Sequence, residues 1–306
     1  MPGPAVNQRV SIIVESFNYS EDGDPATLAR SLRAACDVRQ QDPANREVLL
    51  TDTCGTAVIT DLLKGFPEVR HIQATGLGYD EAKRAAFEAA TGEYLLYLDG
   101  DCVPQPGWLE AHCAALSSGA ASATGGFTRY AGGYLASVWT LMDFGFLFPL
   151  EQRTLGCYAS NNSGFRRAVL QAVPMCGSEM RCNCYAHAQE LMRARQPVLL
   201  IPEARVRHKT PDFFDERLRQ GRDAVAACRV NPALRENGWL ALGVFAAPLF
   251  YGLAVARDWW RLAGAWRDLE LPVWSLPATA LLLPVFRLVD LYGTTQALWR
   301  GANSAL

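Results

Sequence analysis

The chain has little excess charge of either sign. Its 29 Lys and Arg residues nearly balance 31 Asp and Glu residues, which gives a formal net charge of −2 at pH 7. Proteins that bind nucleic acid through its phosphates carry a basic field, so this composition argues against a nucleic-acid partner. With 306 residues, the chain is long enough for one large domain with a substantial core, plus an appendage.

Several common nucleotide and metal motifs are missing. The sequence contains no zinc-finger, helicase or P-loop pattern, and Gly76-Leu-Gly78 lacks the rest of a dinucleotide-binding fingerprint. No basic-then-apolar signal peptide opens the sequence, and its nine cysteines are scattered and odd in number. We therefore expect reduced thiols in a cytosolic compartment.

One stretch points to a chemistry. Leu95–Pro104 reads Leu-Leu-Tyr-Leu-Asp-Gly-Asp-Cys-Val-Pro, an apolar run that ends in the carboxylates Asp99 and Asp101. This pattern is typical of a buried strand followed by a turn, and Gly100 allows the turn to bend tightly. Two hard oxygen ligands at a strand end suit Mg²⁺ or Mn²⁺, with phosphate oxygens or water completing the shell. The alternative is a solvated Asp-Gly turn that closes a hairpin.

The first half of the chain alternates strand and helix signals. The expected strands are Val10–Val14, Val48–Leu50 and Tyr94–Leu98, and the expected helices are Pro25–Cys36, Ile59–Leu63 and Asp80–Ala90. Such alternation predicts a mostly parallel sheet with helices on both faces. Ligands of open sheets bind outside the carboxyl ends of the strands, where Glu15, Asp52 and Asp99 stand in this sequence.

Five segments occur in the order typical of one family. They are Val10–Asn18, Glu47–Cys54, Gly78–Glu93 leading into the Asp-x-Asp strand, Ser160–Arg167 and Pro202–His208. Together they resemble the family 2 glycosyltransferases over about two thirds of the chain. The resemblance implies an α/β protein with the GT-A fold, a mostly parallel central sheet, and transfer of a sugar from a nucleotide diphosphate, with inversion at the anomeric centre.

The resemblance also implies a donor site. Glu15 or Asp52 would accept hydrogen bonds from the base or ribose, and Phe17 would lie beside the base. Lys83 stands where the family often has an arginine that faces the diphosphate, and Asp99 completes the donor site. The alternatives are a core position for Phe17 and a solvated helix face for Lys83.

For the metal, the resemblance implies that Asp99 and Asp101 hold Mg²⁺ or Mn²⁺, which offsets charge on the departing diphosphate. His208 is a further candidate ligand, because the family sometimes has a histidine at this point. In a strand with period two, His208 points away from the face that Arg205 and Arg207 share. A structural histidine is the alternative.

Downstream of this strand, Arg219 and Arg222 are candidates to contact the pyrophosphate, because guanidinium groups match phosphate geometry. A charged helix without a ligand is the alternative. The region faintly resembles a Gln-x-x-Arg-Trp element of the family, but Asp223 stands where the tryptophan would be. This departure argues against a processive polymer synthase.

The catalytic base departs from the family pattern. An inverting transfer needs a carboxylate to take the acceptor's proton, and the family supplies it from a Glu-Asp pair that opens a helix. Here the spacing falls on Asn183 and Cys184. We therefore expect Glu179, just upstream, to be the base, with His187 as the second candidate. A surface acid at a helix start is the alternative for Glu179.

Cys182, Cys184 and His187, together with Cys176, also raise the hypothesis of a structural zinc ion. The spacing Cys-x-Cys-x-x-His lacks the usual Cys-x-x-Cys knuckle. Buried thiols that pack a helix against the floor of the site are the preferred interpretation.

The last part of the chain is apolar and aromatic. Trp239–Ala256 is uncharged and close to the shortest length that spans a bilayer, and the Arg257–Arg261 cluster contains two tryptophans. Leu271–Phe286 is also uncharged, but it is short and contains three prolines, so we expect it to be a poor span. The pattern predicts helices that lie in the membrane surface. A two-span hairpin and a buried helical subdomain are the alternatives.

These observations predict a catalytic domain over residues 1–212, with a nucleotide half (about 1–104) and an acceptor half (about 105–212), and a membrane-associating helical region over 213–306. The predicted function is a metal-dependent, inverting glycosyltransferase with its catalytic domain on the cytoplasmic side of a membrane. Its donor would be a UDP- or GDP-sugar and its acceptor a lipid-linked or other saccharide. The alternatives are a non-catalytic membrane protein that binds nucleotide sugars, and a nucleotidyltransferase.

Overall fold

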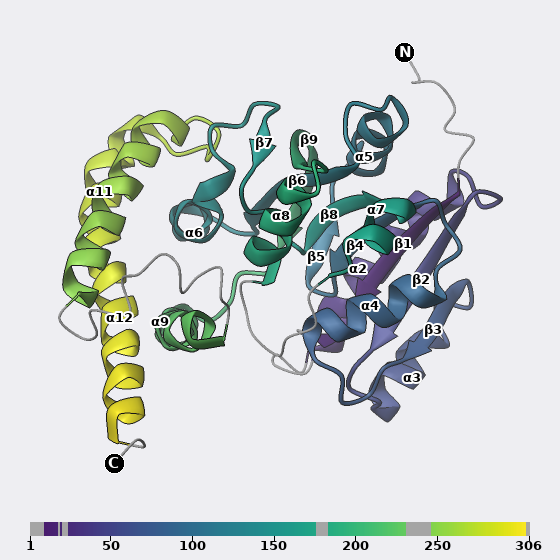
Figure 1. Cartoon of the computed structure of the whole chain (residues 1–306), viewed down its shortest axis with the longest axis horizontal. Coiled ribbons are helices and arrows are strands. Elements are labelled where there is room, and N and C mark those ends of the chain that lie inside the picture. Colours follow the sequence, from purple (N-terminus) through teal and green to yellow (C-terminus); the bar gives the residue numbers. More distant parts are fainter. Residues whose placement is uncertain (1–8, 18, 20–23, 176–182, 231–245, 304–306) are drawn as a thin grey trace. The chain divides into compact units, whose positions relative to one another are not determined.

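The structure is a computed structural model that describes residues 9–17, 19, 24–175, 183–230 and 246–303 (Figure 1). The chain divides into two compact units. The first unit comprises Met1–Arg129, Glu151–Glu179 and Asn183–Lys209, and the second comprises Tyr130–Leu150, Met180–Cys182 and Thr210–Leu306.

The described elements alternate between strands and helices in the first half of the chain, as the sequence predicts. The strands are β1 (Val10–Glu15), β2 (Arg46–Asp52), β3 (Val69–Gln73), β4 (Tyr94–Asp99), β5 (Cys102–Pro104), β6 (Ala123–Tyr130), β7 (Thr154–Leu155), β8 (Asn162–Arg166) and β9 (Val198–His208). The helices are α2 (Pro25–Gln40), α3 (Ala57–Leu63), α4 (Tyr79–Ala89), α5 (Trp108–Ser117), α6 (Tyr134–Phe144), α7 (Arg167–Ala172), α8 (Asn183–Arg193), α9 (Phe213–Val230), α11 (Ala247–Ala265) and α12 (Leu276–Asn303), with the short 3₁₀ helices η1 (Gly145–Leu147) and η3 (Val273–Ser275).

The strands form one mixed sheet in the order β3-β2-β1-β4-β8-β6-β9-β5, with β7 paired to β9. The half formed by β3, β2, β1 and β4 is parallel, and β8 runs antiparallel to β4. Helices connect the parallel strands, because a parallel crossover needs a long connection. The predicted α/β class and mostly parallel GT-A-like sheet are confirmed.

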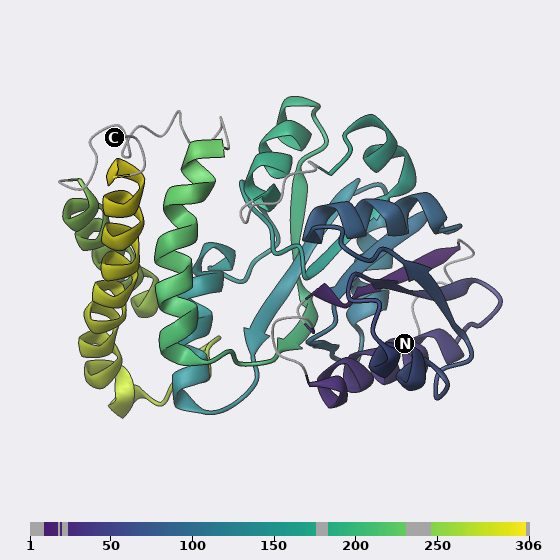
Figure 2. The ribbon, with the colours of Figure 1, turned by 90° about the horizontal axis from the view of Figure 1, so that it is seen from below.

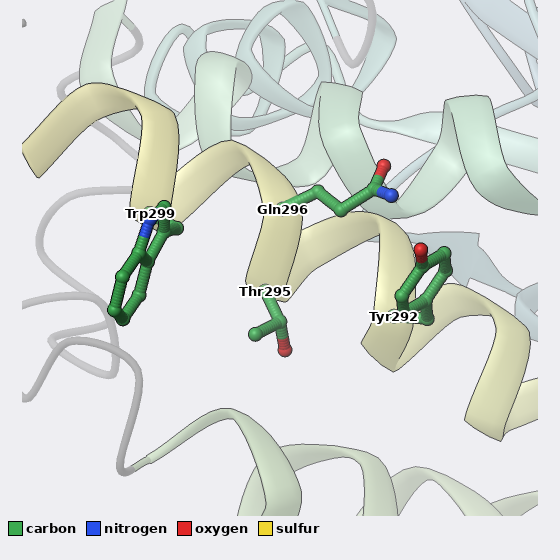
Figure 3. Close-up of a pocket in the computed structure, with 4 residues that line it drawn as sticks. All are labelled: Tyr292, Thr295, Gln296 and Trp299. Carbon is green, nitrogen blue, oxygen red and sulfur yellow. The ribbon is translucent and has the colours of Figure 1, made fainter. Parts of the chain in front are cut away.

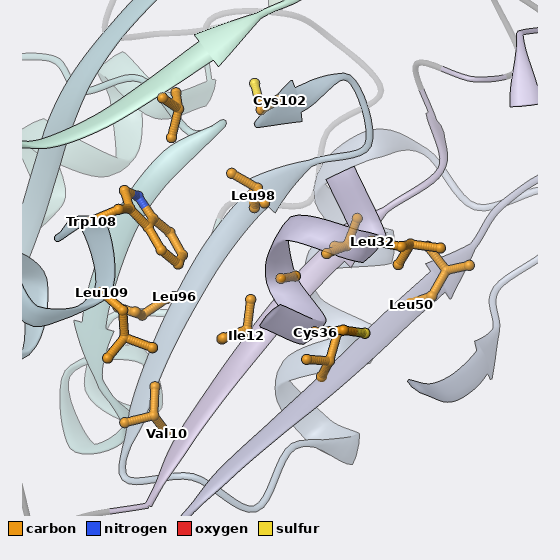
Figure 4. Close-up of a cluster of buried hydrophobic side chains, with 14 of the residues drawn as sticks. Val10, Ile12, Leu32, Cys36, Leu50, Leu96, Leu98, Cys102, Trp108 and Leu109 are labelled. Carbon is orange, nitrogen blue, oxygen red and sulfur yellow. The ribbon is translucent and has the colours of Figure 1, made fainter. Parts of the chain in front are cut away.

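Alternate residues of the parallel strands build the core on one face of the sheet. Ile12, Leu50 and Leu96 are fully buried there against side chains of α2 and α5, among them Leu32 and Trp108 (Figure 4). The helix that begins at Pro25 is capped by Asp24, whose side chain accepts the Ala26 N–H. These apolar contacts fix the sheet on which the site is built.

The opposite face carries the polar strand ends. Side chains alternate along a strand, so Glu15 and Asp99 point away from the core face that holds Ile12 and Leu96. They are also direct partners in the register of β1 and β4. Helix α4 packs on β1, β2 and β3, and the hydroxyl of Tyr97 donates to the backbone carbonyl of Lys83 in this helix. The face with the two carboxyl groups is therefore the face that α4 covers.

The second unit is helical, and its helix α12 corrects one expectation. We expected a short, proline-broken segment at Leu271–Phe286, but α12 continues through Pro284 to Asn303. Pro284 has no N–H to donate to the Ala280 carbonyl, which instead accepts a hydrogen bond from the indole of Trp259 on α11, 2.8 Å away. A tertiary contact thus supplies the hydrogen bond that the proline removes.

Charged side chains lie inside the second unit. Arg287 of α12 contacts Asp258 of α11 at 2.7 Å and Asp290 at 2.8 Å. Arg217 of α9 pairs with Asp143 and lies 3.7 Å from Asp290. These helices pack side by side, α9 against α12 and α12 against α11 (Figure 2). The ion pairs allow α12 to carry two charges within an otherwise apolar stretch.

Large apolar side chains lie on the outside of the same unit. The strongly exposed ones on α11, η3 and α12 are Leu249, Leu253, Trp259, Trp260, Val273, Trp274, Leu281, Val285, Leu288, Tyr292 and Trp299. Tyr292 and Trp299 line a shallow pocket on consecutive turns of α12 together with Thr295 and Gln296 (Figure 3). By length and composition, the stretch Val273–Trp299 is one helical segment apolar enough to cross a membrane, with 33% of its window buried.

Candidate active site

A buried ion pair lies at the centre of the site. The Lys83 ammonium of α4 is 2.8 Å from Asp99 Oδ1 at the end of β4, and both side chains are almost fully buried. The hydroxyl of Tyr79, one turn earlier on α4, lies 2.8 Å from both Asp99 oxygens and 3.0 Å from the Ser160 hydroxyl. The predicted donor residues Lys83 and Asp99 are thus brought together, and Lys83 does not lie on a solvated helix face.

The carboxyl groups of Asp99 and Glu15 both act on this ammonium. Burial raises the pKa of Glu15 well above its ordinary value, and the charge of Asp99 raises it further. Burial alone would lower the pKa of Lys83, but the charges of Asp99 and Glu15 raise it above its ordinary value. Glu15 Oε2 accepts the Phe17 N–H at 2.6 Å, and Oε1 receives no hydrogen bond from a described residue. The site therefore favours an ammonium at Lys83 and a proton on Glu15, beside the charges of Asp99 and Asp101.

Asp101 faces a different partner from Asp99. Its Oδ2 lies 3.5 Å from Nε2 of His208, the last residue of β9. His208 Nδ1 donates to the Lys209 carbonyl at 2.6 Å, because a carbonyl oxygen only accepts, and in the neutral ring Nε2 then carries the lone pair. Ligand atoms of Asp101, Cys102 and His208 lie within 4.8 Å of one another, the one such group among the described residues. In the absence of a metal ion, burial raises the pKa of Cys102 well above its ordinary value.

Position 100 requires glycine because there is no room for a side chain, and not because the backbone bends there. A Cβ at this position would lie 2.5 Å from the backbone oxygen of Glu15 and 2.9 Å from Leu28. The chain between Asp99 and Asp101 therefore passes directly against the end of β1. This close approach holds the two carboxylates next to Glu15.

Asp52 closes a turn at the end of β2. Its Oδ1 accepts the N–H groups of Cys54 at 2.9 Å and Gly55 at 3.0 Å, and Oδ2 lies 3.2 Å from His71 Nε2 on β3. The carboxylate thus shapes the loop at the carboxyl edge of the sheet. His71 was not predicted from the sequence, because only the pairing of β2 with β3 places it beside Asp52.

Asp80 and Asn183 form a second polar contact at this edge. The side-chain amide of Asn183, which opens α8, donates to Asp80 Oδ2. Asp80 is 8% exposed, and burial raises its pKa to about 6 against the opposing effects of Asn183 and Lys83. Position 183 thus holds an amide that contacts a carboxylate on another helix. The sequence did not single out Asp80, because its partner lies far away along the chain.

The structure describes only one of the two residues predicted as bases. Glu179 lies outside the described residues, as do Cys176 and Cys182 of the zinc hypothesis. His187 is buried, with Nδ1 2.7 Å from the Tyr158 hydroxyl and Nε2 3.0 Å from the Val173 carbonyl. Both of its nitrogens are therefore engaged within the fold.

The remaining predicted residues lie in two places. Phe17 is half-buried and meets the Tyr79 ring edge to face, with 5.8 Å between the ring centroids. Arg219 and Arg222 lie on α9 in the second unit, where Arg219 pairs with Glu216 and the Arg222 guanidinium donates to the Leu218 carbonyl. Tyr79 was missed, although its position four residues before Lys83 places both on one helix face.

The fold and this edge of carboxylates define a nucleotide-diphospho-sugar transferase of the GT-A class. The sequence model of glycosyl transferase family 2 matches residues 11–173, more than half of the chain. The protein therefore belongs to glycosyltransferase family 2.

Solved structures agree on the fold. The chain is similar to the mannosyltransferase PcManGT from Pyrobaculum calidifontis, solved with GDP-Man and Mn²⁺, at 17% identity and a TM-score of 0.57, over 99% of this chain and 88% of that one. It is also similar to GalNAc-T7, solved with UDP, GalNAc and Mn²⁺, at 14% identity and a TM-score of 0.53, over 66% of this chain and 44% of that one. No curated protein matches the chain.

The buried ion pair generates a stability prediction. Replacing Lys83 by Met leaves Asp99 buried without its counter-charge, so we expect the free energy of unfolding to fall by about 3–5 kcal/mol. Arg84→Met is the matched control, because Arg84 is 59% exposed and its Glu88 partner lies 3.5 Å away at the surface. That control should lose less than about 1 kcal/mol. Equal losses in urea denaturation would show that the Lys83 pair is screened by solvent.

Asp80 generates a prediction about pH. Its raised pKa means that the folded protein keeps a proton that the unfolded chain releases between about pH 4 and pH 6, so this group destabilises the fold as pH rises through that range. Asp80→Asn removes the effect. We expect the variant to match the wild type near pH 4 and to be more stable by about 2–3 kcal/mol at pH 7. Urea denaturation across this range tests the sign, and a destabilised variant at pH 7 would contradict it.

Proposed function

We propose that the protein is a metal-dependent, inverting hexosyltransferase that uses a UDP- or GDP-sugar and acts on a lipid-linked or other saccharide acceptor. The observation that carries the proposal is the cluster of Glu15, Asp99 and Asp101 at the carboxyl edge of the parallel strands, where Lys83 pairs with Asp99. Membership of family 2 and the nucleotide sugars bound to the similar structures support it.

The donor is proposed to bind across the ends of β1, β2 and β4. Asp52 and Glu15 stand at the ends of two of these strands, and Phe17 follows directly after β1. Asp52 is the candidate partner of the nucleoside, and Lys83 supplies positive charge near the diphosphate. Arg219 and Arg222 on α9 stay candidates for the pyrophosphate.

Asp101 and His208 fit a divalent cation such as Mn²⁺ or Mg²⁺. They offer one carboxylate oxygen and one imidazole nitrogen from neighbouring strand ends, and the Lys209 carbonyl fixes the tautomer of the ring. Asp99 adds negative charge beside them. A bound cation would offset charge that develops on the departing diphosphate.

The second unit is proposed to attach the protein to the cytoplasmic surface of a membrane. Its buried charges, such as those of Arg287 and Asp258, are paired inside the unit, whereas Trp260 and Trp274 are 83% and 79% exposed. Tryptophan side chains favour the boundary between headgroups and acyl chains. An acceptor in the membrane would then lie close to a donor taken from the cytosol.

The metal assignment predicts a specific loss. Asp101→Asn should weaken binding of Mn²⁺ in the presence of UDP or GDP by at least about tenfold, because the substitution removes a charged oxygen ligand. Metal-dependent release of nucleoside diphosphate from UDP- and GDP-sugars should disappear with it. Asp61→Asn, at an exposed acid paired with Lys64, is the control that should keep both properties. Calorimetry and product assays measure them, and an Asp101→Asn protein with unchanged metal dependence would refute the assignment.

The membrane assignment predicts binding to vesicles. Full-length protein should sediment with vesicles of phosphatidylcholine and phosphatidylglycerol, and the double variant Trp260→Glu/Trp274→Glu should lower the partition coefficient by roughly tenfold or more. Val58→Glu replaces an exposed apolar residue of the first unit and serves as the control. Wild-type protein that remains in the supernatant would favour a helical subdomain without a membrane role.

A further inference from the structure

The carboxylate of Asp80 has no part in the donor and metal contacts proposed above. It stands in the first turn of α4, and it is 8% exposed. Within the described part of the chain, its Oδ2 accepts the hydrogen bond from Asn183 and its Oδ1 accepts none. One oxygen is thus held in place, and the other keeps its lone pairs.

Asp80 lies at the edge of the sheet where the donor is proposed to bind. Helix α4 follows β3, and the N-terminus of a helix that follows a parallel strand lies at the carboxyl edge of the sheet. One turn further along α4, Lys83 reaches Asp99 at the end of β4. Asn183 brings the start of α8 to the same place. The pair therefore belongs to the site without belonging to its metal ligands.

The charges around Asp80 come from several elements. Lys83 on the same helix lowers its pKa, and Asp99 at the end of β4 raises it. The Tyr158 phenol and the Cys184 thiol also interact with it. Burial raises the pKa of Tyr158 well above its ordinary value, and the hydrogen bond with Cys157 together with burial does the same for the pKa of Cys184. Both groups stay uncharged near neutral pH. The net surroundings therefore allow Asp80 to change its protonation state close to pH 6.

The other carboxylates of the site are engaged. Asp99 is bound by Lys83 and Tyr79, Asp52 closes its turn and contacts His71, and Glu15 accepts the Phe17 N–H in a fully buried position. A general base needs an oxygen that reaches a substrate hydroxyl and a pKa near the working pH. Asp80 has one oxygen held by Asn183, a second oxygen without a hydrogen bond from a described residue, a place at this edge of the sheet and a pKa raised to about 6.

We propose that Asp80 is the base of the transfer and that Asn183 positions its carboxylate; this assignment rests on the proposed glycosyltransferase function. The acceptor oxygen forms a bond to the anomeric carbon while its proton passes to Oδ1 of Asp80. The bond from the anomeric carbon to the β-phosphate oxygen breaks, and that oxygen keeps the electron pair. The nucleoside diphosphate departs, and Asp80 then releases its proton to solvent.

The test exchanges the side chains of Asp80 and Asn183. Release of nucleoside diphosphate is measured with Mn²⁺ and a panel of UDP- and GDP-sugars, with water as the acceptor. Asp80→Asn should lower the rate by about 10²–10⁴, the usual contribution of a general base. The double variant Asp80→Asn/Asn183→Asp restores a carboxylate bonded to an amide with the roles reversed, and it should regain at least about tenfold of the lost rate. Glu81→Gln, at the exposed neighbouring acid, is the control with unchanged rate.

Two further measurements separate a base from a structural residue. The wild-type rate should fall as pH drops through about 6, and this dependence should be absent from the residual rate of Asp80→Asn. Binding of UDP or GDP with Mn²⁺ should be the same in both proteins. Loss of nucleotide affinity in Asp80→Asn, or a double variant as slow as the single one, would overturn the proposal.

Glu179, the base predicted from the sequence, provides the last comparison. Full activity in Asp80→Asn with loss of activity in Glu179→Gln would overturn the proposal and assign the base to Glu179. A wild-type protein that binds neither UDP nor GDP with Mn²⁺ would instead overturn the glycosyltransferase function itself. The two failures are therefore distinguishable by the binding measurement.

Discussion

The ion pair between Lys83 and Asp99 is the contact on which the rest of the site depends. Parallel strands in register bring Glu15 and Asp99 side by side, and Gly100 lets Asp101 follow within the same small volume. Carboxylates packed this closely repel one another, and burial strengthens the repulsion. A buried ammonium offsets part of this charge, and the raised pKa of Glu15 offsets more. A divalent cation is the natural complement of what remains.

Soluble proteins usually bury apolar side chains and expose charged ones, and several residues of the second unit show the opposite arrangement. Arg217, Arg287, Asp258 and Asp290 are buried among the helices, while several tryptophan and leucine side chains of α11 and α12 are exposed. Burying ion pairs is expensive, and exposing large apolar side chains to water costs further free energy. The cost of the exposed apolar side chains falls if the exterior contacts lipid. This distribution is the physical basis for the proposal that the unit attaches to a membrane surface.

Asp80 illustrates how function and stability oppose each other at such a site. A carboxylate with a raised pKa destabilises the fold at neutral pH, and the same raised pKa suits it to accept a proton during the transfer. The side-chain amide of Asn183 donates a hydrogen bond to this carboxylate, which offsets part of the cost of burying it. A variant that gains stability while it loses the chemical step is the expected signature of a residue retained for catalysis.

The sequence by itself determined three of the parallel strands, the helices between them and the carboxylates at their ends, because apolar periodicity and turn residues act over a few neighbouring positions. Tertiary structure alone decided which groups these carboxylates meet. His71 reaches Asp52 through strand pairing, and Asn183 reaches Asp80 across a long stretch of chain. Tertiary structure also overrode the local rule that a proline ends a helix. The indole of Trp259 donates to the Ala280 carbonyl, which has no N–H partner at Pro284, and α12 continues. Such partners depend on long-range packing, which leaves no periodic mark in the sequence.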